Sequence, residues 1–274
     1  MIKLKNLISI DEVVRSKYIN KDIADKFIQR YCTTSLDRNK HGFKIYRGRN
    51  KNNGMNIQPH MIINPKQSER KSKNTSNIYT SLIDSSDRWK DYPKRSRSII
   101  ATTNKGYAYS YGMPYLVYLI NGAKIGLCSS DDFWGSFKYI KDEFNIGNME
   151  EFNGEVLRFF RNLNDVIGKN LIPNGLSNNI SPNNINSILD KFQSELTEKI
   201  LQTALLDYDI TEFGEKFIDY LKKGGNIREF FDDILDPSKN KFRLTTIENF
   251  NFGSEYDMEI WTDAISVMVI DNEE

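Results

Sequence analysis

The fold class is indicated most clearly by the stretch Ser98–Cys128, which reads SIIATTNKGYAYSYGMPYLVYLINGAKIGLC. Its first six residues, 98–103, are apolar, β-branched or hydroxylated, and they predict a strand that leads into a turn. Residues 104–112 follow as a short helix, because Asn104 is a favourable first residue and Gly112 a typical last one. A strand followed at once by a short helix is therefore expected here.

The second half of the same stretch predicts two more strands. Residues 115–120 form an unbroken apolar run, the strongest strand pattern in the chain. Asn121 and Gly122 behind it are a turn pair, so residues 123–128 are expected to form the returning strand.

Helical patterns lie on both sides of these strands. Before them, the capping box Ser9-Ile10-Asp11-Glu12 and the helical spacing from Ile19 to Tyr31 predict two short helices. After them, residues 145–240 are helical in pattern, with Ser181-Pro182 as one helix start and Asn226 as the cap of another.

Strand patterns also occur outside the central stretch, at residues 43–47 and in the tail from 242 to 270, whereas the polar segment 48–95 predicts loops. The order helices, strands, helices, strands indicates an α+β fold with a helical insertion before its last strands. We expect four parts: an N-terminal helical segment (1–40), a first part of the core (41–144), a helical insertion (145–240) and C-terminal strands that complete the core (241–274).

The composition excludes several classes of protein. Aromatic residues make up 12% of the 274 residues, which disordered chains lack. The longest apolar run is far shorter than the roughly 20 residues that cross a bilayer, so no membrane partner is expected. Two cysteines, Cys32 and Cys128, and two histidines, His41 and His60, provide neither a disulfide framework nor a zinc site. We therefore expect no metal.

The charges are unevenly distributed along the chain, although Lys and Arg total 38 against 37 Asp and Glu. Residues 38–106 carry 16 basic and 4 acidic side chains, a net charge of +12. Residues 224–274 carry 4 basic and 12 acidic side chains, a net charge of −8. The basic segment is typical of a site for a phosphate-bearing ligand or for nucleic acid. The alternative is that the two segments pack together and neutralise each other.

Two elements in the basic half carry residues suited to an anionic ligand. Arg47 ends a predicted strand; its planar guanidinium suits a diphosphate or a ribose, and Gly48 beside it allows a ligand to approach the backbone. The strand–turn–helix at 98–111 offers hydroxyl groups at a strand end and aromatic faces one turn later.

A third element lies in the acidic tail. Asp257 and Glu259 are two residues apart, so an extended chain places both carboxylates on one face. Two like charges on a buried face need a cation, a hydrogen bond or solvent.

In this order, the three elements resemble the arginine–serine–glutamate class of ADP-ribosyltransferases. That family has an Arg at the end of a first strand, a Ser-Thr-Ser strand before a helix, and a Glu-x-Glu or Gln-x-Glu turn. Arg47, Ala101-Thr102-Thr103 and Asp257-Met258-Glu259 occupy the corresponding positions.

The resemblance covers roughly residues 41–140 and 241–274, and residues 94–137 are also similar to segments of tailed-phage proteins of this fold. It implies a core with a split sheet, mixed or antiparallel, and a reaction in which NAD is a substrate.

The resemblance also implies roles for individual residues. Glu259 is the expected catalytic carboxylate, bonded to a ribose hydroxyl, and Asp257 would orient the acceptor. Arg47 would hold the diphosphate, and Tyr107 or Tyr111 would stack on the nicotinamide. The residues expected to bind NAD are Arg47, Gly48, Ser98, Thr102, Thr103, Tyr107 and Tyr111.

Two departures from the family pattern keep other functions open. Ala101 replaces the first serine, whose usual hydrogen bond must then come from Ser98 or Thr102 or be missing. Asp257 is one methylene shorter than the family's Glu or Gln. A second hypothesis is therefore a catalytically inactive member of the fold that acts as a virion-associated or host-protein-binding protein. A third is a nucleic-acid-binding protein that uses the basic segment 38–106.

The richness in Asn, Ile and Lys, residues with AT-rich codons, indicates a low-GC bacterium or its phage as the source. For an enzyme of this kind we expect a host protein or nucleic acid as the acceptor. The expected location is the cytoplasm, that of the host if a phage encodes the protein, or else the virion.

Overall fold

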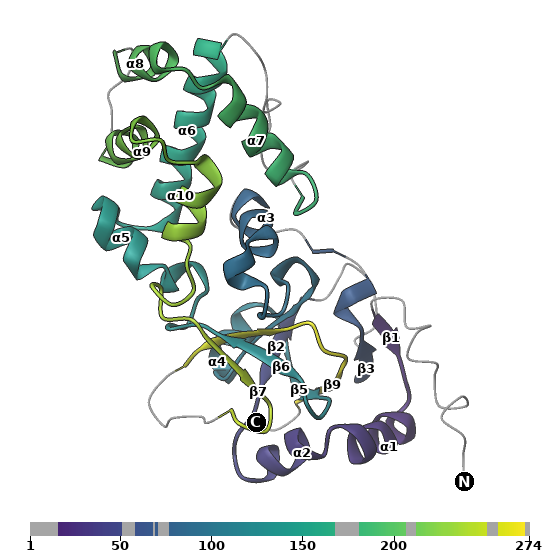
Figure 1. The fold of residues 1–274 in the computed structure, drawn as a ribbon. Coiled ribbons are helices and arrows are strands. Elements are labelled where there is room, and N and C mark those ends of the chain that lie inside the picture. The colour runs from purple at the N-terminus through teal and green to yellow at the C-terminus, as the bar shows by residue number, and fades with distance from the viewer. Residues whose placement is uncertain are drawn as a thin grey trace. The chain divides into compact units, whose positions relative to one another are not determined.

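The protein is described by a computed structural model that covers residues 16–50, 58–67, 69–70, 77–167, 181–206, 212–250 and 257–271. The chain divides into two compact units (Figure 1). The sheet unit comprises Met1–Arg70, Tyr92–Phe133 and Phe242–Glu274, and the helical unit comprises Lys71–Asp91 and Trp134–Lys241. The helical unit is thus larger than the insertion expected at 145–240. The predicted capping box at residues 9–12 lies outside the described residues.

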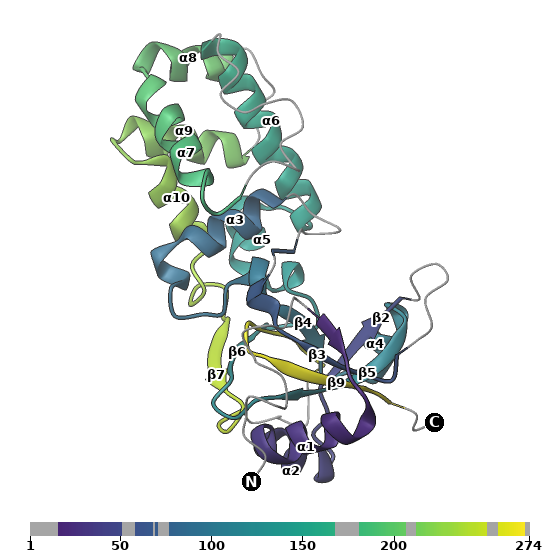
Figure 2. The ribbon, with the colours of Figure 1, turned by 90° about the vertical axis from the view of Figure 1, so that its right-hand side faces the viewer.

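The sheet unit is built on one hydrogen-bonded sheet in the strand order β1-β3-β9-β5-β2-β4-β8-β6-β7. All neighbouring strands in the described part of the chain are antiparallel, so the fold is α+β with a continuous antiparallel sheet rather than a split or mixed one. In Figure 2 the yellow strand β9 lies between β3 and β5. The strands are β1 (Ser16–Tyr18), β2 (Tyr46–Arg49), β3 (His60–Ile63), β4 (Ile99–Thr102), β5 (Met113–Leu119), β6 (Lys124–Leu127), β7 (Arg243–Thr246), β8 (Glu259–Thr262) and β9 (Ser266–Ile270).

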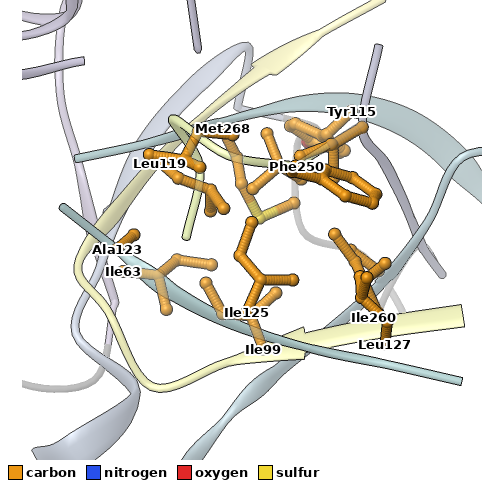
Figure 3. Close-up of a cluster of buried hydrophobic side chains, with 14 of the residues drawn as sticks. Ile63, Ile99, Tyr115, Leu119, Ala123, Ile125, Leu127, Phe250, Ile260 and Met268 are labelled. Carbon is orange, nitrogen blue, oxygen red and sulfur yellow. The ribbon is translucent and has the colours of Figure 1, made fainter. Parts of the chain in front are cut away.

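One face of this sheet encloses an aliphatic core (Figure 3). Side chains from β3 and β6, which are second from the two ends of the sheet, point toward one another in it, which shows that the sheet curves around the cluster. Its members include Ile63, Ile99, Tyr115, Leu119, Ala123, Ile125, Leu127, Phe250, Ile260 and Met268.

Two N-terminal helices, α1 (Lys21–Tyr31) and α2 (Thr33–Lys40), lie beside the sheet (Figure 1). The side chain of Asn20 caps α1 by accepting a hydrogen bond from the amide of Ile23. Phe27 and Ile28, two of the buried residues of α1, join Ile62 and Val267 in a second apolar cluster. The helical stripe predicted from Ile19 to Tyr31 is therefore the packing face of α1.

The central stretch contains the expected elements but not the expected hairpin. Strand β4 is followed by α4 (Lys105–Ser110), β5 and β6. The predicted return of β6 alongside β5 is wrong: β5 pairs with β2 and β9, whereas β6 pairs with β7 and β8. Gly122 has a positive φ of 75°, so a turn does form there. Leu119 and Ile125 are both fully buried in the aliphatic core, so the chain turns a corner of the curved sheet between them.

The helical unit is held together by a phenylalanine core. Its helices are α3 (Asn77–Ser85), α5 (Lys138–Phe144), α6 (Met149–Ile167), α7 (Ile185–Glu195), α8 (Glu198–Leu206), α9 (Glu212–Lys222) and α10 (Ile227–Ile234). The rings of the phenylalanine core are in mutual contact and belong to Phe144, Phe152, Phe159, Phe160, Phe192, Phe213, Phe217, Phe230 and Phe231.

Of two helix boundaries predicted in this unit, one differs from expectation and one agrees. Ser181-Pro182 does not begin a helix, because the residues up to Asn184 form a turn and α7 begins at Ile185. The cap predicted at Asn226 is confirmed, since its side chain accepts a hydrogen bond from the amide of Arg228. Among the described residues, no helix combines the length and the apolar character needed to cross a bilayer.

Candidate functional site

The three strands that carry the sequence motifs, β2, β4 and β8, are neighbours in the sheet. Tyr46 on β2 pairs with Thr102 on β4, and Thr102 pairs with Glu259 on β8. Residues paired directly across antiparallel strands share a face of the sheet, so these three side chains lie in one row. The structure thereby brings Thr102 and Glu259 together although they are far apart in sequence.

Arg47 does not belong to this row. It follows Tyr46 by one residue, and successive residues of a strand alternate between faces. Its guanidinium donates a hydrogen bond to the carbonyl oxygen of Ile100, with an Nη1–O distance of 2.8 Å. Since β2 and β4 share only the pair Tyr46–Thr102, this bond holds the two strands together where their ladder ends.

Gly48 is required by packing within the fold. A Cβ atom at this position would lie 1.9 Å from the carbonyl oxygen of Ala108 and 2.8 Å from the Cβ of Tyr111, both from the segment of α4. The close approach expected for a ligand is therefore made by α4 itself.

Glu259 is buried, and both of its carboxylate oxygens have partners. The residue is 6% exposed. Its Oε1 lies 2.6 Å from Nη2 of Arg95, and its Oε2 accepts a hydrogen bond of 3.4 Å from the amide of Phe133. The backbone of Glu259 is also fixed, because its amide donates to the carbonyl of Ser130 and its carbonyl accepts from the amide of Cys128.

Arg95 is the residue of this site that sequence reasoning missed. It begins the 3₁₀ turn Arg95–Arg97 just before β4 and is 4% exposed. Its guanidinium carbon lies 3.5 Å from the ring centroid of Phe133 and 5.6 Å from that of Trp261. We call Arg95, Glu259, Phe133 and Trp261 the Arg95 cluster. The sequence signal was weak, because Arg95 belongs to the run Lys94–Arg97, where three of the four residues are basic.

The hydroxyl groups predicted to bind NAD have partners within the fold. Oγ1 of Thr102 accepts a hydrogen bond of 3.1 Å from the amide of Asn104. Oγ1 of Thr103 accepts one of 3.1 Å from the amide of Met258, which joins the ends of β4 and β8. Oγ of Ser98 donates to the carbonyl of Lys94 at 2.6 Å. These contacts shape the strand end.

Asp257 lies at the surface just before β8 and is linked to α4 through Asn104. Nδ2 of Asn104 donates to Oδ2 of Asp257. Oδ1 of Asn104 caps α4 by accepting a hydrogen bond from the amide of Tyr107. Asp257 is therefore the exposed carboxylate of the pair and Glu259 the buried one.

Tyr107 and Tyr111 form an aromatic pair on α4. Their ring centroids are 5.4 Å apart in an edge-to-face arrangement, and their hydroxyl oxygens are 3.3 Å apart. Tyr107 is half-buried, and Tyr111 is 43% exposed. Burial raises the pKa of Tyr107 above its usual value, and the hydrogen bond with Tyr111 and the negative charges of Asp132 and Glu259 raise it further. The Tyr107 hydroxyl is thus in the field of the Glu259 carboxylate.

The uneven charge distribution corresponds to ion pairs between the two segments. Each pair joins a cation of residues 38–106 to a carboxylate of residues 224–274. They are Lys66–Asp263 (3.1 Å), Arg88–Asp236, Arg95–Glu259 (2.6 Å) and Lys105–Asp271 (3.0 Å). Four of the 16 cations of residues 38–106 are therefore neutralised in this way, so the asymmetry seen in the sequence is neutralised in part.

Within the ranges that the structure describes, no group of three or more His, Cys, Asp or Glu side chains is arranged to hold a metal ion. Comparison with known proteins returned no matching family model, no matching curated protein and no matching solved structure.

Proposed function

We propose that this chain is an ADP-ribosyltransferase that uses NAD to modify a host protein or nucleic acid. The observation that carries the proposal is the row on neighbouring strands, in which the buried carboxylate of Glu259 lies next to Thr102. Tyr107 lies close enough for its pKa to respond to the charge of Glu259. A carboxylate held in a sheltered site beside aromatic side chains suits a reaction that develops positive charge on a sugar.

In the proposed reaction, the bond between the ribose C1′ and the nicotinamide nitrogen breaks, and nicotinamide leaves with the bonding electron pair. The acceptor supplies the electron pair for the new bond to C1′ and loses a proton. The transition state resembles an oxocarbenium ion, as in glycoside hydrolysis. Glu259 would bond a ribose hydroxyl and stabilise the positive charge, while Asp257, exposed at the surface, would orient the acceptor.

The predicted contact between Arg47 and the NAD diphosphate has to be made beside a bond within the fold. Nη1 of Arg47 is bonded to the carbonyl of Ile100, and strand alternation places the side chain on the opposite face from Glu259. The diphosphate would therefore compete with that carbonyl for the guanidinium or bind other N–H groups of it. Tyr107 and Tyr111 remain the proposed stacking platform for nicotinamide, because they belong to the helix that follows β4.

The test is transfer of label from NAD to proteins and nucleic acids of a host lysate. Glu259→Gln keeps the size of the side chain and removes its charge, so it is expected to lower transfer at least about 100-fold. Asp263→Asn is the matched control, since it removes a carboxylate beyond the other end of the same strand. Transfer that survives in Glu259→Gln contradicts the assignment of this residue.

A second candidate function, a catalytically inactive member of the fold that binds a host or virion protein, is favoured by one observation. The Glu259 side chain is only 8% exposed and is ion-paired with Arg95. On this proposal, millimolar NAD neither raises the unfolding temperature nor donates label. An NAD-dependent rise in the unfolding temperature contradicts it.

Nucleic-acid binding by residues 38–106 stays a prediction. Four of the 16 cations of that segment are paired with carboxylates of residues 224–274, which reduces the charge available for phosphates. Binding to nucleic acid that weakens steeply as the salt concentration rises would support that function.

A further inference from the structure

We infer that Arg95 is the positioning residue of this site, which fixes the carboxylate of Glu259 for the reaction; the inference rests on the proposed function. A carboxylate that stabilises charge in a transition state is effective only when its oxygens are held in place before the reaction begins. Arg95 acts through Glu259, not on the substrate.

Arg95 and Glu259 form a short, buried ion pair. Nη2 of Arg95 lies 2.6 Å from Oε1 of Glu259, and both side chains are almost fully buried, at 5% and 8% exposure. The amide of Phe133 takes the second oxygen at 3.4 Å. Each oxygen of the carboxylate therefore has one donor, and the charged donor, Arg95, makes the shorter contact.

Arg95 is itself held in place by the aromatic side chains around it. Its guanidinium carbon is 3.5 Å from the ring centroid of Phe133, a cation–π distance. Trp261, on the same strand as Glu259, donates from Nε1 to the carbonyl of Pro93 at 2.9 Å and stacks on Tyr92. The residues just before Arg95 are thereby tied to β8, so the cation and the carboxylate are positioned by the same strand.

No polar side chain of the described residues 98–102 competes with Arg95 for the carboxylate of Glu259. Ala101 has no polar side-chain atom. The hydroxyl of Ser98 donates to the carbonyl of Lys94, and that of Thr102 accepts from the amide of Asn104. Among the described side chains of 98–102, none is bonded to Glu259 in place of Arg95.

The chemistry of the pair makes lysine a graded test. An ammonium group keeps the positive charge but lacks the planar face that packs on Phe133 and the forked donor geometry. In Arg95→Lys the carboxylate of Glu259 should therefore be positioned less accurately. Arg95→Gln should lose both the positive charge and the forked donor geometry.

The experiment measures kcat and KM for NAD with the full chain, by release of nicotinamide and by label transfer to lysate. We expect kcat to fall about 100-fold in Arg95→Gln and about 10-fold in Arg95→Lys, while KM changes less than about 3-fold. Lys66→Met is the control, because it breaks the ion pair with Asp263 at an exposed lysine and leaves both constants unchanged.

Other outcomes overturn the inference in distinguishable ways. An unchanged kcat in Arg95→Gln means that Arg95 is not a positioning residue. A raised KM with unchanged kcat means that Arg95 contacts NAD directly. If Arg95→Gln does not fold, the kcat of Arg95→Lys decides in the same way. A wild-type chain that neither cleaves NAD nor transfers label overturns the proposed function itself, and the inference with it.

Discussion

Aromatic side chains have different contact partners in the two units of this protein. In the helical unit, the rings of the phenylalanine core pack against one another, as Phe217 does with Phe230 at a centroid distance of 4.4 Å. In the sheet unit, the rings of Phe133 and Trp261 lie beside a buried guanidinium that is paired with a carboxylate.

This difference separates a core whose contacts are apolar from a cluster built around a buried ion pair. Packed aromatic rings stabilise a fold by burying apolar area. A buried ion pair loses its hydration and is often no more stable than apolar residues of similar size. A buried ion pair beside aromatic rings is therefore weak evidence for stability, and we propose a functional role for the Arg95 cluster.

The largest expected effect comes from breaking the ion pair on one side. Arg95→Met leaves the Glu259 charge buried without its cation and should lower the free energy of unfolding by about 3–5 kcal/mol. The double variant Arg95→Met with Glu259→Leu removes both charges and should recover most of that loss. Urea unfolding measures both. If Arg95→Met lowers the free energy of unfolding by less than about 1 kcal/mol, the buried charge of Glu259 does not depend on Arg95 for its stability.

A smaller effect is expected from adding one methyl group in each unit. Gly48→Ala places a Cβ 1.9 Å from the backbone oxygen of Ala108, so it should destabilise the protein by about 3 kcal/mol, the upper end of overpacking costs. Gly154 in α6 has open space around its Cα and helical geometry, so Gly154→Ala should stabilise by about 1 kcal/mol. Thermal unfolding of the two variants checks both signs. Equal effects would mean that α4 does not pack tightly on β2.

The third effect depends on pH, belongs to the helical unit and is smaller than the effects of Arg95→Met and Gly48→Ala. Burial alone raises the pKa of Asp236, but hydrogen bonds from Ser238 and Arg88 outweigh it and lower that pKa from 3.8 to about 2. Because the pKa is lower in the folded state, the carboxylate stabilises the fold above pH 4 by about 2 kcal/mol, and this is lost as pH falls toward 2.

The measurement is the unfolding free energy of the wild type minus that of Asp236→Asn, between pH 6 and pH 2. The difference should shrink as the solution is acidified. Asp219→Asn, at a carboxylate that is 68% exposed, is the matched control and should show little change. A difference that stays constant with pH contradicts the assignment of this shift to Asp236.

Local patterns in the sequence predicted the elements whose stabilising contacts are close in the chain. The strand and short helix at 98–112 and the cap at Asn226 depend on neighbouring residues, and they are present. The helix α3 was missed although its polar residues Asn77, Thr80, Ser81 and Asp84 recur at helical spacing, because it lies within the polar segment 48–95, whose composition is typical of loops.

Contacts between distant segments were not predictable from these patterns. Arg95 and Glu259 are 164 residues apart, and no local signal connects them. The corner between β5 and β6 has the composition of a hairpin turn, and only the aliphatic core of the whole sheet unit decides against a hairpin. The motifs of Arg47 and Glu259 could be located, but the face of the sheet on which each lies depends on register.

The sheet unit is built from three separate segments of the chain, so its strands are synthesised at different times. Strand β4 leaves the ribosome long before its neighbour β8, and at 5–20 residues per second the 164 residues between Arg95 and Glu259 take about 10–30 s to synthesise. During that interval one edge of β4 has no strand to pair with, while the whole second segment of the helical unit emerges. The nascent chain therefore carries the unpaired edge of β4 for seconds before β8 is made.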